Sequence, residues 1–119
     1  ASFFINEDTK NDLLAMGSSL SRDVVPSDQV REISVETAPL WRVLEQNDCP
    51  RDYFLLSIDA EGFDPVVVQT AGFDRFRPRI VCVEEAIFGR TIPDMMETAG
   101  YDRLTQLGPN GVYRRRETW

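Results

Sequence analysis

Acidic residues follow two apolar runs of this sequence, at the point where each run ends. They are Asp59 and Glu61 after residues 53–58, and Glu84 and Glu85 after residues 79–83. If the two runs are neighbouring parallel strands, these carboxylates gather at the sheet edge where open α/β sheets bind ligands. Carboxylates in such a place act as general bases or hold a hard cation through their oxygens. The alternative is that acids merely end strands in a chain that has 20 acidic residues.

Histidine is absent from the 119 residues. This excludes histidine-dependent nucleophile systems, histidine general bases and most zinc sites from this chain. Acid–base or metal chemistry therefore needs carboxylates, or residues of another chain.

Charge and apolar content exclude two classes of partner. The formal net charge of −7 repels nucleic-acid phosphates, and the one basic run, residues 114–116, is either a solvated strand end or an anion contact. No apolar stretch approaches the roughly 18 residues of a membrane-spanning helix, and no signal peptide is visible. Cys49 and Cys82 lack the spacing of a disulfide framework. We expect a cytoplasmic protein that binds neither nucleic acid nor membrane.

The elements that position the acids can be read from the chain around them. Residues 53–58 (YFLLSI) and 79–83 (RIVCV) are nearly apolar throughout, which is typical of parallel strands covered by helices on both faces. Between them, Asp64-Pro65 forms a helix cap and first turn, and Gly72 marks a helix end. The three valines in between favour a strand, but we predict a helix because parallel strands need a crossover.

The flanking segments complete an α/β layout. The predicted elements are a strand at 2–6, a helical turn at 12–16, a loop at 18–29, a strand at 30–37, helices at 39–46 and 92–99, and a hairpin of 101–107 with 112–116. Alternating polarity indicates the strand at 30–37, and Gly100 ends the last helix. This order predicts a single α/β domain with a parallel sheet, right-handed crossovers and a closing antiparallel hairpin.

Several motifs occur along the chain in an order typical of one enzyme family. They are residues 17–20 (GSSL), 35–37 (VET), 53–64 (YFLLSIDAEGFD), 73–84 (FDRFRPRIVCVE), 100–101 (GY) and 110–113 (NGVY). The third resembles a buried strand that runs into Ile-Asp-x-Glu-Gly-x-Asp/Glu, and the fourth is similar to Arg-Pro-Lys-x-Ile-x-Val-Glu. On these motifs the chain resembles the FkbM family of S-adenosylmethionine-dependent methyltransferases over nearly its whole length.

The resemblance implies a Rossmann-like class I methyltransferase sheet, with residues 1–119 as a single partial domain, the C-terminal half. It implies S-adenosylmethionine as cofactor, a divalent cation as a further candidate, and a small-molecule or sugar hydroxyl as methyl acceptor. Asp59 would position the acceptor or remove its proton, directly or through the cation, and Glu61 would support that geometry. Glu84 and Asn110 would bind the acceptor. No residue is assigned as a metal ligand.

Two departures from the family pattern bear on the cofactor. Leu40 precedes Trp41, where the family often has Leu followed by Asp or Asn. No two of the seven glycines form G-x-G, and the glycine-rich turn and acidic strand end that would hold the cofactor are missing. We therefore expect the cofactor-binding half to be absent and the isolated chain to be inactive.

Two other functions stay open, a catalytically silent binding or assembly module and a carboxylate-based metal hydrolase, which the resemblance disfavours. The missing half also predicts assembly. In the resembled fold a cofactor-binding strand pairs with residues 53–58, so its loss leaves an uncharged strand edge that recruits another strand. We expect a homodimer that covers this edge, unless residues 30–35 fold back onto it.

Overall fold

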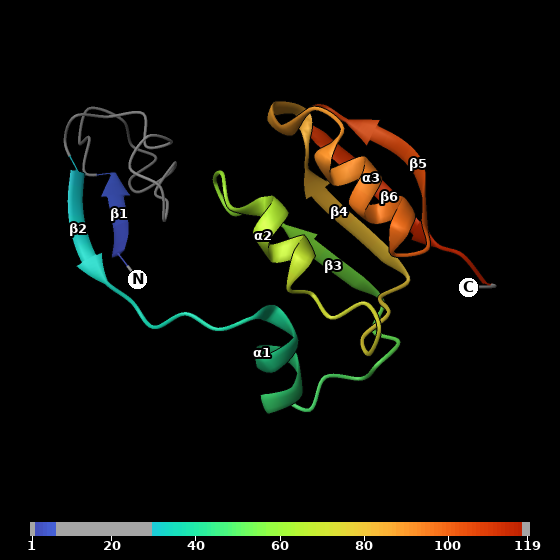
Figure 1. Ribbon diagram of the computed structural model, residues 1–119, viewed down its shortest axis with the longest axis horizontal. Coiled ribbons are helices and arrows are strands. Elements are labelled where there is room, and N and C mark those ends of the chain that lie inside the picture. The colour runs from blue at the N-terminus through green and yellow to red at the C-terminus, as the bar shows by residue number, and fades with distance from the viewer. Residues whose placement is uncertain (1, 7–29, 118–119) are drawn as a thin grey trace. The chain divides into compact units, whose positions relative to one another are not determined.

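The computed structural model describes the backbone of residues 2–6 and 30–117 (Figure 1). The predicted helical turn at 12–16 and loop at 18–29 lie outside the described residues. The chain divides into two compact units, one of Ala1–Thr37 with Ala60–Phe63 and one of Ala38–Asp59 with Asp64–Trp119. None of the helices in the described ranges is long and apolar enough to cross a membrane.

The first unit contains a two-stranded antiparallel sheet. Strand β1, Ser2–Asn6, pairs with β2, Val30–Ser34, so that Ser2 lies opposite Ser34. Both strands were predicted, but the expectation that the second belongs to the parallel sheet is wrong. Alternating polarity indicates a half-exposed strand without identifying its partner, and such strands are typical of antiparallel sheets.

The second unit is a small α/β domain with a mixed sheet of four strands, in the order β3-β4-β6-β5. Its elements in chain order are α1 Leu40–Gln46, β3 Leu55–Ile58, α2 Asp64–Gln69, β4 Ile80–Glu84, a short 3₁₀ helix η2 Ala86–Phe88, α3 Thr91–Thr98, β5 Tyr101–Leu107 and β6 Asn110–Arg115. Strands β3 and β4 are parallel, whereas β6 is antiparallel to both β4 and β5. The predicted α/β class, the parallel pair and the closing hairpin are confirmed.

Helix α2 forms where strand propensity alone would place a strand. Asp64 and Pro65 open it, and the Thr70 hydroxyl donates to the carbonyl of Val66 over 2.9 Å in its last turn. Gly72 then adopts a positive φ of 70°. A Cβ at Gly72 would lie 2.6 Å from the Cβ of Trp41 in α1, so the glycine permits both the helix end and the close approach of α1.

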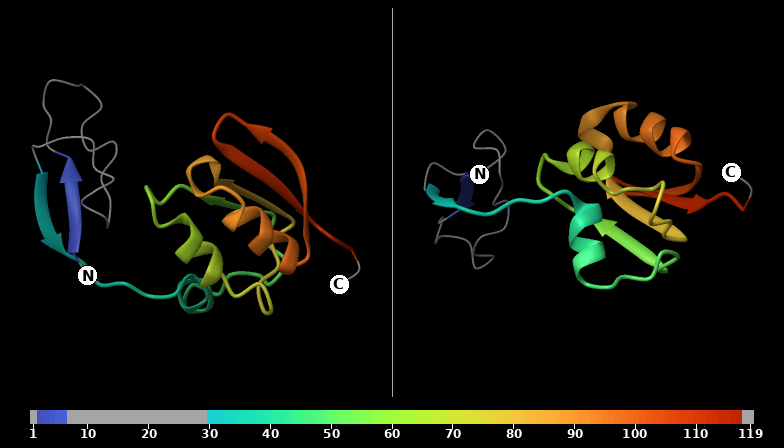
Figure 2. Two further views of the ribbon diagram at one scale, coloured as in Figure 1. Left: turned by 45° about the horizontal axis from the view of Figure 1, so that its top comes forward. Right: turned by 60° about the horizontal axis from the view of Figure 1, so that its bottom comes forward.

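The core of the second unit lies between the sheet and two helices. Helices α2 and α3 lie side by side over one face of the sheet (Figures 1 and 2). The fully buried side chains on this face and on the helices include Val81, Val83, Tyr113, Ile92 and Met96. Burying an aliphatic side chain of this size contributes roughly 1.5–3 kcal/mol, so this face supplies most of the packing that holds the strands in place.

The opposite face of the sheet is more open. The register places Leu55, Ile80 and Arg114 in one row across three strands, and Leu55 remains 51% exposed. The expectation that helices cover residues 53–58 on both faces is therefore wrong for the described part of the chain. An apolar run indicates a strand that tends to be buried, but it does not identify what buries it.

Strand β3 lies at one edge of the sheet. Among the strands that the structure describes, it pairs only with β4, while β2 pairs with β1.

Candidate functional site

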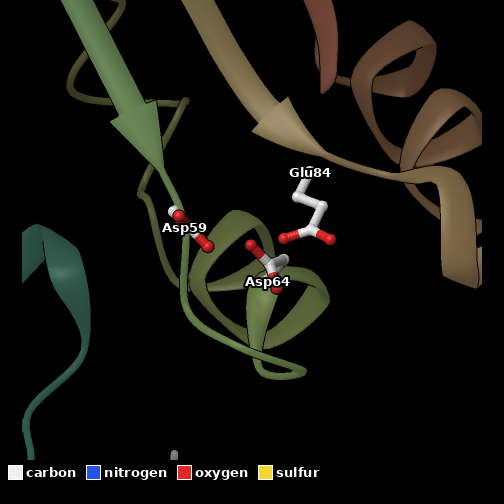
Figure 3. Close-up of side chains that lie close together, drawn as sticks. All are labelled: Asp59, Asp64 and Glu84. Atoms are coloured by element: carbon white, nitrogen blue, oxygen red, sulfur yellow. The ribbon is translucent and has the colours of Figure 1, made fainter. Parts of the chain in front are cut away.

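Three carboxylates meet beyond the carboxyl ends of the parallel strands β3 and β4. Asp59 follows β3, Glu84 ends β4, and Asp64 is the first residue of α2. Figure 3 shows the three side chains directed toward one another, and one oxygen of each lies within 4.8 Å of the others. We call Asp59, Asp64 and Glu84 the carboxylate group.

The parallel register explains why the group forms. Ile58 lies beside Val83, so the residue after β3 and the last residue of β4 reach the same sheet edge. The short crossover then returns the chain to this edge at Asp64, where a carboxylate in the first helical turn is favoured by the partial positive charge of the helix start. Side-chain exposure differs within the group, since Asp59 is exposed, Glu84 is half-buried and Asp64 is fully buried.

The residues predicted from the sequence are only partly brought together. Asp59 and Glu84 meet as predicted, and Asn110 lies opposite Glu84 as its antiparallel partner in β6. Glu61 lies in the turn before α2 with a positive φ of 46°, followed by Gly62 at 101°, and it is not a member of the carboxylate group.

Asp64 is the one member of the carboxylate group that was not predicted from the sequence as a site residue. Its position before proline indicated a helix cap, and that role left no reason to seek another. The available signal was the motif itself, because Asp64 occupies the last acidic position of residues 58–64 (IDAEGFD). Its complete burial could not be inferred from the pattern.

Glu85 points away from the carboxylate group, and the expectation that it joins the other three acids is wrong. Successive side chains of a strand face opposite sides, so Glu85 enters the core with only 2% exposure. There it accepts a hydrogen bond from the hydroxyl of Tyr113 and forms an ion pair with Arg103. Burial raises the pKa of Tyr113, against the opposing effect of Arg103, so the phenol stays protonated and donates. Glu85 is thus a structural carboxylate.

Gly111 lies against the Glu85 carboxylate. A Cβ at this position would be closer to the carboxylate than van der Waals contact allows. We expect Gly111→Ala to lower the free energy of unfolding by about 1–3 kcal/mol, the usual range for overpacking a dense site. Chemical denaturation measures this, with Thr105→Ala at an exposed position of β5 as control. If both variants were as stable as the parent, this result would contradict the close packing of Gly111 against the Glu85 carboxylate.

The carboxylate group can do two kinds of chemistry. Hard divalent cations bind oxygen ligands at about 2.0–2.6 Å, so ligands across an ion are roughly twice that distance apart. Oxygens within 4.8 Å of one another fit this geometry, although acidic clusters also occur without an ion. Alternatively, the exposed Asp59 can accept a proton from a bound hydroxyl, while Glu84 beside it, and Asn110 beside Glu84, orient the substrate.

A hollow of about 460 Å³ between α2 and α3 lies apart from the carboxylate group. Its lining is mainly apolar and includes Val68, Phe73 and Met95, together with the two acids Asp74 and Asp94. It contains no member of the carboxylate group, so we place the candidate chemistry at the strand ends, where the polar groups converge.

No protein-family model, curated protein or solved structure matches this chain. The motifs and the geometry of the carboxylate group are therefore the features that indicate a function.

Proposed function

We propose that this chain is the C-terminal part of an S-adenosylmethionine-dependent methyltransferase that methylates a hydroxyl oxygen of a small molecule or sugar. The observation that carries the proposal is the place of Asp59. It belongs to the family-like motif at residues 58–64 and follows a parallel strand. It also lies within a group of three carboxylates whose oxygens are within 4.8 Å of one another. Motif and geometry thus indicate the same residue.

The proposed roles follow from exposure and position. The cofactor, when bound, supplies an electrophilic methyl group. The sulfur of the cofactor keeps the electron pair of the broken carbon–sulfur bond. Asp59, as the exposed member, orients the acceptor hydroxyl and takes its proton as the new oxygen–carbon bond forms. Glu84 and its strand neighbour Asn110 hold the acceptor, and Glu61 supports the turn that follows Asp59. In-line transfer needs mainly proximity and orientation, so few residues suffice.

The carboxylate group also fits a divalent cation, which would lower the pKa of a bound acceptor hydroxyl. Asp59, Asp64 and Glu84 would be its protein ligands. In this arrangement Asp59 would orient the acceptor through the ion instead of removing the proton itself.

We expect the 119-residue chain to bind S-adenosylmethionine weakly or not at all. No two of its seven glycines form the G-x-G of a cofactor cradle, and that cradle supplies the backbone contacts to the cofactor in this fold class. Isothermal titration calorimetry measures the binding. Saturable binding with a dissociation constant of about 1 μM, equivalent to about −8 kcal/mol, would contradict this expectation.

The test of the function uses the complete coding product. We expect the flanking coding sequence to encode a glycine-rich strand-to-helix turn upstream, and the complete protein to transfer labelled methyl from S-adenosylmethionine to hydroxyl-bearing acceptors. A complete protein that binds the cofactor but methylates no sugar or small-molecule hydroxyl would refute the assigned reaction.

The second candidate is a catalytically silent assembly module derived from such an enzyme. The exposed edge of β3 favours it, because an uncharged strand edge is suited to pairing. A coding sequence that contains no cofactor-binding turn would support this candidate over the enzyme.

A further inference from the structure

The row of side chains that contains Glu84 and Asn110 continues onto β5. Asn110 pairs with Glu84 on one side and with Leu107 on the other. Residues in register across a sheet face the same side, so Leu107 faces the side of Glu84 and Asn110. Asp59 follows β3, the neighbour of β4, and lies beside Glu84. This end of the sheet thus changes from carboxylates at β3 and β4 to an apolar side chain at β5.

Two strongly exposed apolar side chains lie at this end of the sheet. Leu107 is 61% exposed and Ile87, in η2, is 66% exposed, and we call them the apolar pair. In the described part of the chain, Phe54 is the only other large apolar residue with such exposure. A Cβ added at Gly89 or Gly108 would meet no atom within 4 Å, so there is room beside both turns. Apolar surface next to a few convergent polar groups is typical of small-molecule sites.

Hydrogen bonds fix the backbone that carries the apolar pair. The amides of Glu85 and Ala86 both donate to the carbonyl of Pro109, over 3.0 and 3.2 Å, and so join η2 to the turn between β5 and β6. The side chain of Gln106 donates to the carbonyl of Gly108 over 3.1 Å in the same turn. The apolar pair directly adjoins these bonded residues along the chain. Its place relative to Glu84 and Asn110 is therefore set by the fold.

We propose that the methyl acceptor is an amphiphilic hydroxyl compound, whose apolar group packs against the apolar pair while its hydroxyl lies at Asp59. This role rests on the proposed function, which already requires the space beside Asn110 to admit the acceptor. Because Leu107 is the register partner of Asn110, an acceptor held by Asn110 also meets Leu107. With neighbouring strands about 4.8 Å apart, Asp59 and Leu107 lie roughly 14 Å apart at their Cα atoms. A single sugar ring spans only part of that distance.

The two ends of the row select different chemical groups. The carboxylate group accepts hydrogen bonds from hydroxyls and disfavours an anionic group. The side chains of the apolar pair offer no hydrogen-bonding group, and their burial against an alkyl chain or an aromatic ring is favourable. A wholly polar acceptor would leave the apolar pair in water. The row therefore fits an acceptor with one hydroxyl-bearing end and one apolar end.

Titration of the 119-residue chain, followed by nuclear magnetic resonance, tests the site without cofactor or methyl transfer. The probes are methyl, phenyl and octyl β-D-glucosides, which share one sugar, and the octyl compound is kept below its critical micelle concentration. We expect the phenyl or the octyl glucoside to bind at least about tenfold more tightly than the methyl glucoside, the effect of burying about two methylene groups. The amide signals of Ile87 and Leu107 should shift most. The tighter of the two probes shows whether the apolar group is a ring or a chain.

Substitutions then test the apolar pair. We expect Leu107→Asn and Ile87→Asn each to weaken binding of the tighter glucoside at least about fivefold, whereas Leu107→Met, which stays apolar, should bind within about twofold of the parent. The matched control is Leu104→Asn, which changes a 49% exposed leucine of the same strand and should also stay within about twofold. All three positions are exposed, so we expect folded variants, and circular dichroism checks this.

Three results would overturn the proposal. The first is equal affinity for the three glucosides, which includes no saturable binding of any of them. The second is a loss of binding in Leu104→Asn that equals the loss in Leu107→Asn. The third is a set of shifts centred on Phe54 and Leu55, which would indicate general binding of a detergent to exposed apolar residues.

Transfer of labelled methyl by the complete coding product separates this proposal from the proposed function. Binding at the apolar pair without transfer to any hydroxyl compound would refute the methyltransferase and leave the apolar site. Transfer to the methyl glucoside at a rate that Leu107→Asn does not change, and that neither apolar glucoside exceeds, would refute the apolar site and leave the methyltransferase. We expect transfer to the tighter apolar glucoside, lowered at least about fivefold by Leu107→Asn at subsaturating acceptor.

Discussion

Asp59→Asn in the complete coding product should lower turnover by about 100-fold or more, the usual scale for the loss of an acid–base group. Asparagine keeps the shape of the side chain but cannot take the acceptor proton, and it is a weaker ligand for a divalent cation. Because Asp59 is exposed, the substitution removes no buried contact, and we expect the fold to be preserved. Initial rates at saturating acceptor and cofactor measure the effect.

The matched control is Asp74→Asn, the same substitution at an exposed aspartate outside the carboxylate group. Its turnover should stay within about twofold of the parent. Adding Mg²⁺ or Mn²⁺ in a titration separates the two roles of Asp59, because an ion-mediated role makes the parent depend on the metal. Full turnover of Asp59→Asn at saturating acceptor would show that the assigned role is wrong.

Arg103→Leu should lower the free energy of unfolding by about 2–4 kcal/mol. Removing one partner of a buried ion pair leaves the other charge uncompensated, which is strongly destabilising. Glu85 is 2% exposed while the Arg103 side chain is 42% exposed, so we place the effect below the range for fully buried pairs. For a domain of this size the shift in melting temperature would be on the order of 10 °C.

Two further variants separate the buried charge from the loss of a surface arginine. Arg90→Leu removes an exposed i,i+4 ion pair with Asp94 at 3.2 Å, and pairs of this kind contribute only about 0.3–0.5 kcal/mol. Combining Arg103→Leu with Glu85→Gln should recover part of the lost stability, since the neutral amide needs no counter-charge. All variants are compared at one protein concentration, because dimerisation changes apparent stability. If Arg103→Leu and Arg90→Leu had equal effects, the pair with Glu85 would be unimportant.

Local signals in the sequence predicted most elements of the second unit. The proline before α1, the Asp-Pro start of α2 and the glycine after α3 each act within one helical turn, so their effect can be read from neighbouring residues. The partner of β2 could not be read in this way. Pairing joins residues distant in sequence, and the alternation of residues 30–34 is compatible with several partners.

The candidate site was predictable to the extent that it depends on strand ends. Asp59 and Glu84 were identified because acids after parallel strands reach one sheet edge. Glu85 was assigned to the same place, although the period of two along a strand directs it to the opposite side. Asp64 was missed because a helix cap already explained it, and its burial depends on tertiary packing that no local pattern encodes.

The distance along the chain between paired strands has a consequence for the synthesis of this protein. Leu107 pairs with Asn110 only three positions later, whereas Leu55 pairs with Ile80, 25 positions later. Closing the longer loop costs about 2 kcal/mol more in chain entropy. Since β3 also emerges from the ribosome before β4 does, its apolar side chains and unpaired backbone are exposed to other chains before β4 can pair with them.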